Sequence, residues 1–164
     1  RLIVVGNLPF NIATELLMRL AEGSDQIDRM VLMFQKEVGD RIAAKPGSKS
    51  YGRLSVMVQW MCEVESCFDV PPSAFVPAPK VSATVLRITP RAQTAFPATR
   101  ESLRAVTAAA FGQRRKTMRN ALKPILDDPE AALVGAGLSP SIRAERIDLA
   151  GFCSLAREFE ARTK

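Results

Sequence analysis

An asparagine, a proline and an aromatic residue stand together in the tetrapeptide Asn7-Leu8-Pro9-Phe10, directly after a run of apolar residues. The exocyclic amine of a nucleobase is a poor nucleophile, because its lone pair is delocalised into the ring. An asparagine oxygen and a backbone carbonyl are able to accept the two N–H groups of such an amine. Proline restricts φ and so fixes a neighbouring carbonyl, and an aromatic ring stacks on a base. These residue types favour chemistry on a base amine. They also suit a simple polar turn, in which Pro9 and Asn11 begin the next helix.

The elements around the tetrapeptide predict where it lies. Residues 1–7 form an unbroken apolar run, and so do residues 29–35, as is typical of strands buried on both faces. Residues 11–23 between them have helical periodicity, with Ile12, Leu16, Leu17 and Leu20 on one face. We expect a right-handed strand–helix–strand unit. Since ligands of open α/β sheets bind at the carboxyl ends of strands, the tetrapeptide is well placed for a site.

The remaining pattern predicts two segments of different character. Up to residue 92 we expect helices at 36–44 and 54–61, strands at 65–70 and 81–88, and a proline-rich loop at 71–79. After a linker at 90–97 the pattern is helical throughout. We expect one helix that begins after the cap residue Thr99, a second over 114–123, and a third that starts at Asp128-Pro129. A last helix carries an apolar stripe of Phe152, Leu155 and Phe159. We therefore expect an α/β domain over 1–92 and a small all-α domain over 98–164.

Composition excludes several kinds of chemistry. The chain of 164 residues has no histidine, which excludes Ser-His-Asp and Cys-His catalysis and histidine-ligated metals. Its three cysteines, Cys62, Cys67 and Cys153, have no metal-ligand spacing and indicate reduced thiols, so we expect no metal. No apolar run is long enough for a membrane span, and no secretory signal is present. These features predict a cytoplasmic protein with no membrane partner.

Positive charge is concentrated in one stretch. The formal net charge is +6, and no acidic residue occurs between Ser102 and Leu126. That window holds six basic residues: Arg104, Arg114, Arg115, Lys116, Arg119 and Lys123. On a helix over 114–123, Arg115, Arg119 and Lys123 would stack along one face, where like charges are unfavourable without an external anion. An ordinary solvated face is the alternative to a phosphate-binding one.

Several motifs resemble one enzyme family. The tetrapeptide is similar to the catalytic Asn/Asp-Pro-Pro-Tyr/Phe motif of S-adenosylmethionine-dependent adenine-N6 methyltransferases. The segments QKEVGDRI (35–42), SKSYGRLSVMVQ (48–59) and VPPSAFVPAPKVSATVLRI (70–88) resemble the ribosomal RNA adenine dimethyltransferases. AFGQRRKTMRNALK (110–123) and RAERIDLAGFCSLARE (143–158) resemble the members that act on small-subunit (16S) rRNA. The resemblance covers nearly the whole chain.

The resemblance implies a function and assigns residues to it. It implies N6,N6-dimethylation of two adjacent adenosines near the 3′ end of small-subunit rRNA during ribosome biogenesis, with S-adenosyl-L-methionine as cofactor. Asn7 would hold the target amine and meet the cofactor, the Leu8 carbonyl would accept the second N–H, and Pro9 would fix that carbonyl. Phe10 and Phe75 would stack on the two faces of the adenine. Arg114, Arg115, Lys116, Arg119 and Lys123 would bind RNA.

One departure from the family is large. The family's glycine-rich, cofactor-binding strand–turn–helix is absent, since the glycines of the first half (Gly6, Gly23, Gly39, Gly47 and Gly52) form no GxG pattern. The expected fold is thus the C-terminal half of a Rossmann-like methyltransferase sheet followed by a small all-α domain. We expect the chain alone to bind cofactor weakly and to be inactive, and its first strand to form a bare sheet edge.

Two alternatives remain at this point. A non-catalytic RNA-binding ribosome assembly factor would need the basic stretch and no cofactor site, although binding alone does not need the tetrapeptide. A relative that acts on DNA, like the mitochondrial transcription factors similar to this family, is the other alternative. The intact tetrapeptide favours the enzyme.

Overall fold

The computed structural model describes residues 1–113 and 115–163 and divides the chain into two compact units. The sheet unit consists of Arg1–Ala43 and Val58–Thr94, and the helical unit of Ala44–Met57 and Ala95–Lys164. The sequence-based division placed residues 44–57 with the α/β segment. In the structure they cluster with the helical unit instead, and helix α3 (Arg53–Met61) begins in one unit and ends in the other.

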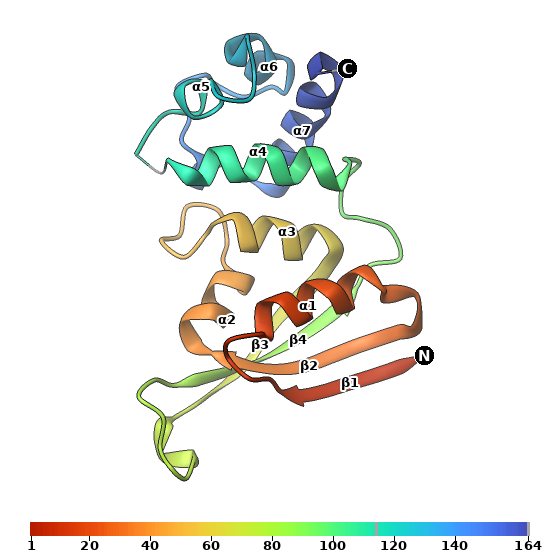
Figure 1. The fold of residues 1–164 in the computed structure, drawn as a ribbon, viewed down its shortest axis with the longest axis vertical. Coiled ribbons are helices and arrows are strands. Elements are labelled where there is room, and N and C mark those ends of the chain that lie inside the picture. Colours follow the sequence, from red (N-terminus) through yellow and green to blue (C-terminus); the bar gives the residue numbers. More distant parts are fainter. Residues whose placement is uncertain (114, 164) are drawn as a thin grey trace. The chain divides into compact units, whose positions relative to one another are not determined.

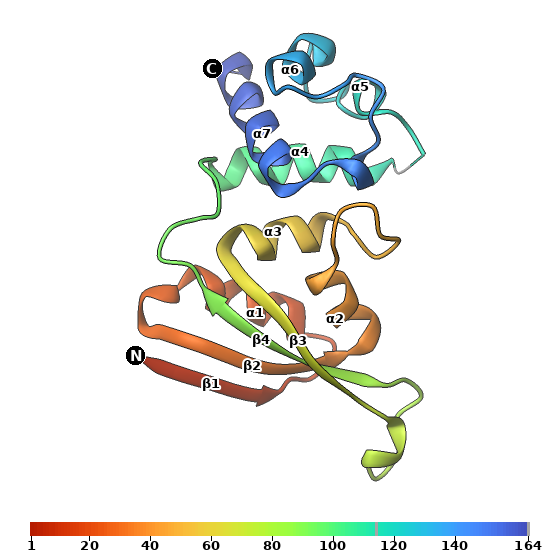
Figure 2. The same cartoon turned by 180° about the vertical axis from the view of Figure 1, so that it is seen from behind.

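The sheet unit contains four strands in the order β1-β2-β4-β3 (Figures 1 and 2). Strands β1 (Leu2–Asn7) and β2 (Ile27–Gln35) are parallel and are connected through helix α1 (Ala13–Glu22). Strand β4 (Ala83–Pro90) is antiparallel to both β2 and β3 (Cys62–Val70). The predicted strand–helix–strand unit is therefore confirmed in its order and its parallel pairing, and β3 starts three residues earlier than predicted, at Cys62 rather than Glu65.

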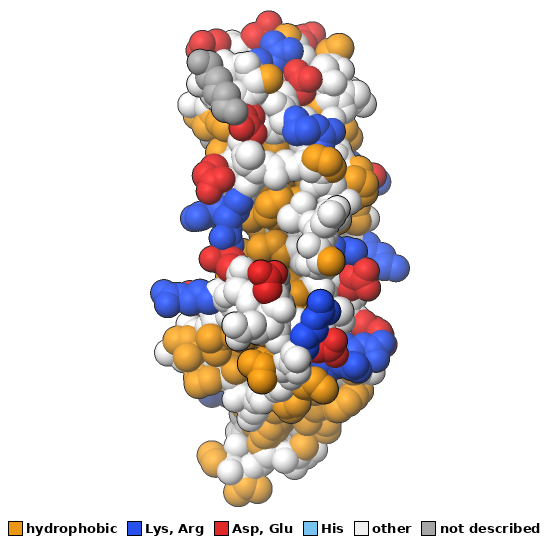
Figure 3. Space-filling model, turned by 90° about the vertical axis from the view of Figure 1, so that its right-hand side faces the viewer, with side chains coloured by type: hydrophobic (Ala, Val, Ile, Leu, Met, Phe, Trp, Pro, Cys, Tyr) orange, Lys and Arg blue, Asp and Glu red, His pale blue; other side chains and the backbone are white. Residues whose placement is uncertain are grey.

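Alternate residues of the two central strands make the core of the sheet unit. Met30, Leu32 and Phe34 of β2 are fully buried, as are Leu86 and Ile88 of β4. Helices α1 and α2 (Lys36–Ala43) lie on the same side of the sheet (Figures 1 and 2). Strand β1 has a neighbour on one side only among the described strands, and its Ile3 and Val5 are 60% and 75% exposed. The predicted bare edge is thus present. Figure 3 shows hydrophobic side chains gathered on the sheet unit, in the lower part of that view.

The buried face of α1 differs from the predicted one. Its buried residues are Ala13, Leu17 and Ala21, whereas Ile12 is 44% exposed and Leu16 and Leu20 are half-buried. Leu17 of the predicted face is confirmed, but the prediction counted only bulky residues and so missed the two alanines. The structure instead buries a stripe with alanines on both sides of Leu17, because small side chains let a helix approach its neighbours closely.

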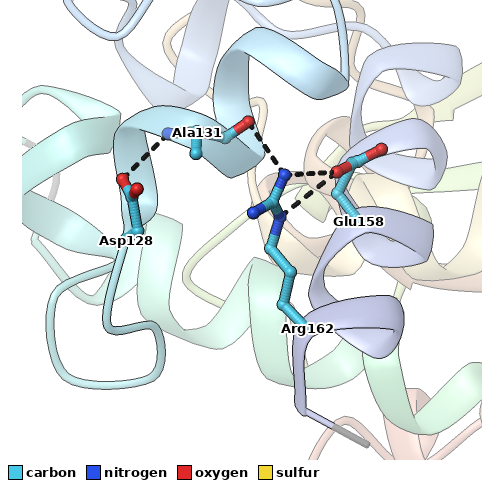
Figure 4. Close-up of polar contacts among 4 residues, drawn as sticks. All are labelled: Asp128, Ala131, Glu158 and Arg162. Atoms are coloured by element: carbon cyan, nitrogen blue, oxygen red, sulfur yellow. Dashed lines mark hydrogen bonds and ion pairs between the residues drawn. The ribbon is translucent and has the colours of Figure 1, made fainter.

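The helical unit is built from α4 (Arg100–Gly112), α5 (Met118–Ala121), α6 (Pro129–Gly135) and α7 (Leu149–Thr163). The predicted caps are confirmed, since Thr99 accepts a hydrogen bond from the Ser102 amide and Asp128 accepts one from the Ala131 amide. Figure 4 shows how α6 is attached to α7: the Arg162 guanidinium donates to the Ala131 carbonyl (3.3 Å) and to Glu158 (3.1 Å). Phe152 and Leu155 of α7 are fully buried, and Phe159 is half-buried.

The predicted helix over 114–123 is wrong. Only Met118–Ala121 is helical, and Arg114 lies outside the described residues. The backbone amides of Met118 and Arg119 donate to the carbonyls of Ile142 (2.8 Å) and Pro140 (3.2 Å), so a distant segment takes the hydrogen bonds that a longer helix would have made. Pro124 has no amide hydrogen and cannot extend the helix beyond its end. Arg115, Arg119 and Lys123 consequently do not form one helical row.

None of the described helices is both long and apolar enough to span a membrane.

Candidate active site at the end of strand β1

The tetrapeptide begins with Asn7, the last residue of β1, which pairs with Met33 of β2. The Asn7 side chain is exposed and makes no hydrogen bond to any described residue. The next hydrogen bond along the chain runs from the Ile12 amide to the Pro9 carbonyl (3.1 Å) and closes the turn into α1. No turn hydrogen bond from a described residue uses the Leu8 carbonyl. Among the described residues, two acceptors at the strand end, the Asn7 amide oxygen and the Leu8 carbonyl, are thus without a hydrogen-bond donor.

Gly6 has no side chain, and this leaves room for Leu8 of the tetrapeptide to pack against it. A Cβ at Gly6 would lie 3.1 Å from Cδ2 of Leu8 and 3.5 Å from Cδ2 of Leu32. The Leu8 side chain therefore folds back over Gly6, beside the fully buried Leu32. This packing holds the Leu8 backbone while its neighbours Asn7 and Pro9 remain exposed.

The strand register brings the predicted aromatic residues to the same end of the sheet. Asn7 pairs with Met33, Gln35 with Ala83, and Ala83 with Val70, so the ends of β1, β2 and β3 meet the start of β4 there. The loop between β3 and β4, which carries Phe75, extends beyond the strands in Figure 1.

Phe10 and Phe75 share that end of the sheet without touching. Phe10 is 41% exposed and Phe75 is half-buried. Neither ring stacks on another ring among the described residues. Strand β2 separates β1 from β4, which corresponds to about 10 Å between the two strands.

A cluster of charges at this end of the sheet was not predicted from the sequence. Lys36, the first residue of α2, forms ion pairs with Asp40 (3.0 Å) and with Asp69 near the end of β3 (3.1 Å), and its amide donates to Ser82. The hydrogen bonds to Asp40 and Asp69 raise the pKa of Lys36, and the bond from Lys36 lowers the pKa of Asp69. The cluster joins the end of β3 to the start of α2, and so fixes one root of the loop that carries Phe75. No local sequence signal indicates a pair 33 positions apart.

The predicted RNA-binding residues lie in the helical unit. Arg115, Lys116 and Lys123 are exposed in the turns around α5. Arg119 is exposed too, but its guanidinium lies 3.6 Å from the Glu130 carboxylate. Residues 102–126 contain no acidic side chain, but Glu130, just beyond them in the sequence, forms an ion pair with Arg119.

The parallel β1–α1–β2 unit and the antiparallel β4–β3 pair define the C-terminal part of a Rossmann-like methyltransferase sheet. The solved structures agree. A dimethyladenosine transferase from Plasmodium falciparum superposes with a TM-score of 0.84 at 22% identity, covering 98% of this chain and 67% of that one. The 23S rRNA methyltransferase ErmE superposes with a TM-score of 0.70 at 21% identity, covering 96% of this chain and 65% of that one.

The chain belongs to the ribosomal RNA adenine dimethylase family, whose profile matches residues 1–161. Among its relatives is the ribosomal RNA small subunit methyltransferase A of Rhodospirillum rubrum, 56% identical over 158 residues, which cover 96% of this chain and 54% of the relative. The protein of the same name from Paramagnetospirillum magneticum is 52% identical, covering 98% of this chain and 57% of the relative. The chain thus spans little more than half the length of these two relatives.

Proposed function

We propose that this chain is the target-base half of an enzyme that dimethylates adenine N6 in small-subunit rRNA during ribosome biogenesis. The observation that carries the proposal is the exposed Asn7 amide at the carboxyl end of β1, which has no hydrogen-bond partner among the described residues and is followed by the fixed turn at Pro9. Family membership and the names of the relatives support the same reaction. The targets would be two adjacent adenosines near the 3′ end of the RNA.

The residues at the strand end act by positioning. The Asn7 side-chain oxygen and the Leu8 carbonyl accept the two N–H groups of the adenine amine and turn its lone pair toward the methyl donor. Leu8 is held by its packing over Gly6, so its carbonyl keeps its orientation. Phe10 stacks on one face of the adenine, and Phe75 covers the other. The amine loses one proton to solvent for each methyl group that it gains, and this step needs no covalent enzyme intermediate or metal.

The residues present fit one side of an S-adenosyl-L-methionine site. When bound, this cofactor supplies the electrophilic methyl group. Asn7 is exposed at the strand end, where α/β sheets bind their ligands, and is the residue of this chain that would meet both cofactor and target base. The sequence contains no glycine-rich strand–turn–helix, so the chain supplies the acceptor side of the site and not its donor side.

Arg115, Lys116 and Lys123 are proposed to contact the RNA backbone from the helical unit. Their exposure and charge suit phosphate contacts, which give affinity but little sequence information. Arg119 contributes less, because Glu130 already neutralises part of its charge. Arg114 is retained in the proposal on its sequence position alone.

The test joins this chain to the part of the Rhodospirillum rubrum relative that it does not match. The fusion is assayed for methyl transfer from labelled S-adenosylmethionine to unmethylated small ribosomal subunits. Asn7→Ala is expected to reduce the rate at least a hundredfold, on the order of the loss when a positioned polar group is removed from an active site, while RNA binding is retained. Asn11→Ala, at an exposed position in the same turn, is the matched control. A fusion that binds RNA but transfers no methyl group would support the assembly-factor alternative.

A further inference from the structure

Strand β2 ends with Gln35, to which the proposed function assigns no role. Asn7 is the last residue of the parallel neighbour β1 and pairs with Met33, so Gln35 lies two positions further along β2. With about 4.8 Å between strands and about 3.3 Å per residue, the Cα atoms of Asn7 and Gln35 are roughly 8 Å apart. The two side chains therefore start from neighbouring points at one end of the sheet.

Gln35 and Asn7 also share one face of the sheet. Successive side chains of a strand point to opposite faces. In β2, Leu32 is fully buried, whereas Met33 and Gln35 on the other face are half-buried. In β1, a Cβ on Gly6 would lie 3.5 Å from Cδ2 of Leu32, so Gly6 is on the face of Leu32. Asn7 is therefore on the opposite face, together with Met33 and Gln35.

The Gln35 side chain is half-buried and makes no hydrogen bond to any described residue. Gln59, another half-buried glutamine, differs, because its Nε2 group donates to the Ile42 carbonyl (2.9 Å). A glutamine amide has two N–H donors and an acceptor oxygen. In Gln35 these groups have no partner among the described residues, at the strand end where α/β sheets bind their ligands.

The backbone around Gln35 is fixed. Gln35 pairs with Ala83 of β4. The next residue, Lys36, donates its amide to the Ser82 carbonyl (2.9 Å), and its ammonium group lies 3.1 Å from the Asp69 carboxylate. The Cα atom of Gln35 is thus held in place before any ligand arrives, and only the torsions of its side chain remain to be set on binding.

The target base proposed above has a second polar group beside its amine. In adenine, the ring nitrogen N1 is bonded to the carbon that carries N6, and it is an acceptor on the Watson–Crick edge, the edge by which enzymes read a flipped base. The Asn7 oxygen and the Leu8 carbonyl suit the N–H groups of the amine, and neither can donate to N1. The amide nitrogen of Gln35 can. Guanine has an oxygen in place of the amine and a hydrogen on N1, so it is mismatched at both positions.

Two methyl transfers to one amine make a contact at N1 more important in the second transfer. N6-methyladenine keeps one N–H group, so only one of the two acceptors, the Asn7 oxygen or the Leu8 carbonyl, still has a donor. N1 is not changed by methylation of N6. A donor at N1 therefore holds the base at the stage when its amine is held least well.

We infer that Gln35 donates its side-chain amide to N1 of the target adenine and holds the base in place for the second methyl transfer. This inference rests on the proposed function, because it takes the ligand at the strand end to be adenine. It makes Gln35 a substrate-binding residue that contributes to the choice of base and to the completion of dimethylation.

The test uses the fusion with the Rhodospirillum rubrum relative and small subunits whose RNA ends in a ligated oligonucleotide. The oligonucleotide carries either adenosine or 1-deazaadenosine, in which a C–H group replaces N1, at both target positions. In the wild-type fusion the analogue is expected to lower kcat/KM about tenfold, the effect of leaving one donor unpaired. In Gln35→Met, adenosine itself is expected to react about tenfold more slowly, with little further loss for the analogue.

The comparison contains its own controls. Any effect of the analogue on the reactivity of the amine is common to both proteins and cancels between them. Gln26→Met changes an exposed glutamine just before β2, at the opposite end of the same strand. This variant is expected to keep both the wild-type rate and the tenfold effect of the analogue.

The products give a second readout. At equal total methyl incorporation, Gln35→Met is expected to yield more N6-methyladenosine relative to N6,N6-dimethyladenosine than the wild-type fusion, as measured by mass spectrometry of the nucleosides. A general loss of stability or of RNA binding slows both transfers and leaves this ratio unchanged. An unchanged ratio in Gln35→Met therefore contradicts the role in the second transfer.

The outcomes separate the contact at N1 from the proposed function. If the analogue slows Gln35→Met by the same factor as the wild-type fusion, the inference is overturned and the enzyme proposal stands. If the wild-type fusion binds RNA but transfers no methyl group, both are overturned. Gln35→Glu keeps the size of the side chain but presents only acceptor oxygens at neutral pH, and it takes the place of Gln35→Met should that variant fail to fold. A wild-type rate in Gln35→Glu would also overturn the inference.

Discussion

Gly39 of α2 faces Thr84 of β4 so closely that a Cβ on Gly39 would lie 2.1 Å from the Thr84 Cγ2 atom. At this point the helix contributes no side chain and its backbone packs directly on the Thr84 side chain, and both residues are buried. The contact sets the position of α2, whose first residue is Lys36. Lys36 in turn is ion-paired to Asp69 at the root of the loop that carries Phe75. A helix–strand contact thus determines part of the geometry of the candidate site.

Gly39→Ala is expected to destabilise the sheet unit by about 1 to 3 kcal/mol, the usual cost of overpacking a core. Thr84→Ser removes the Cγ2 atom, at a cost of about 0.8 kcal/mol for the lost methyl group. The double variant should therefore be more stable than Gly39→Ala alone. Urea unfolding of the four proteins measures the coupling. Additive effects of the two substitutions would contradict the contact.

The exposed edge of β1 is expected to cause self-association. Ile3 and Val5 are both more than half exposed on a strand with one free side, and such edges pair with other strands. Sedimentation velocity should show concentration-dependent dimers or larger species. Val5→Lys should reduce them, whereas Val134→Lys, at a position 63% exposed on α6, should not. A wild-type monomer at high concentration would contradict this prediction.

The three thiols are expected to differ in reactivity. Cys67 is exposed, whereas burial raises the pKa of Cys62 to about 12 and that of Cys153 to about 11. At pH 8, iodoacetamide should therefore alkylate Cys67 in the native chain and all three cysteines in urea, as read by intact mass. Rapid native labelling of Cys153 would show that the helical unit opens locally.

The same burial predicts a loss of stability at alkaline pH. Above pH 9, the ordinary value for a thiol, Cys62 and Cys153 ionise in the unfolded chain but stay protonated in the folded one. The unfolded state then binds fewer protons, so the free energy of unfolding decreases as the pH rises from 9 toward 11. The urea midpoint should be lower at pH 10 than at pH 8, and Cys67→Ser should show the same decrease. A midpoint that rises with pH would contradict the assignment.

Glu130 is expected to suppress RNA binding by Arg119. Their side chains are both more than half exposed and lie within ion-pair distance. Glu130→Gln should therefore strengthen RNA binding and steepen its salt dependence. Lys123→Gln should reduce the salt slope by about 0.7 to 0.9, and Arg119→Gln by less. Anisotropy titrations measure all three effects. Equal effects of Arg119→Gln and Lys123→Gln would show that the ion pair with Glu130 does not weaken RNA binding by Arg119.

The 164-residue chain by itself is expected to bind S-adenosylmethionine weakly and to transfer no methyl group. The proposed acceptor side of the site is at Asn7, and the sequence of the chain contains no glycine-rich turn for the donor side. Isothermal titration calorimetry of the chain, with the Rhodospirillum rubrum relative as positive control, measures the difference. Tight binding to the chain alone would contradict the division of the site into two halves.

Much of the fold was predictable because its signals are local. Apolar runs indicated β1 and β2, and single residues fixed helix starts at Thr99 and Asp128. The predictions that were wrong, a helix over 114–123 and a leucine face on α1, also relied on local periodicity. For residues 114–123 a distant segment decided the outcome, as the hydrogen bonds from Met118 to Ile142 and from Arg119 to Pro140 show.

The sequence by itself determined the order of the elements and the tetrapeptide at the end of the first strand, since strand and helix periods, caps and motifs are properties of neighbouring residues. The tertiary structure alone decided the strand order β1-β2-β4-β3, the Lys36–Asp69 ion pair and the Gly39–Thr84 contact. Each of these joins residues far apart in the chain. Such contacts form because the free energy gained by burying a shared core exceeds the entropic cost of bringing the segments together. The spacing of residues along the chain does not reveal that balance.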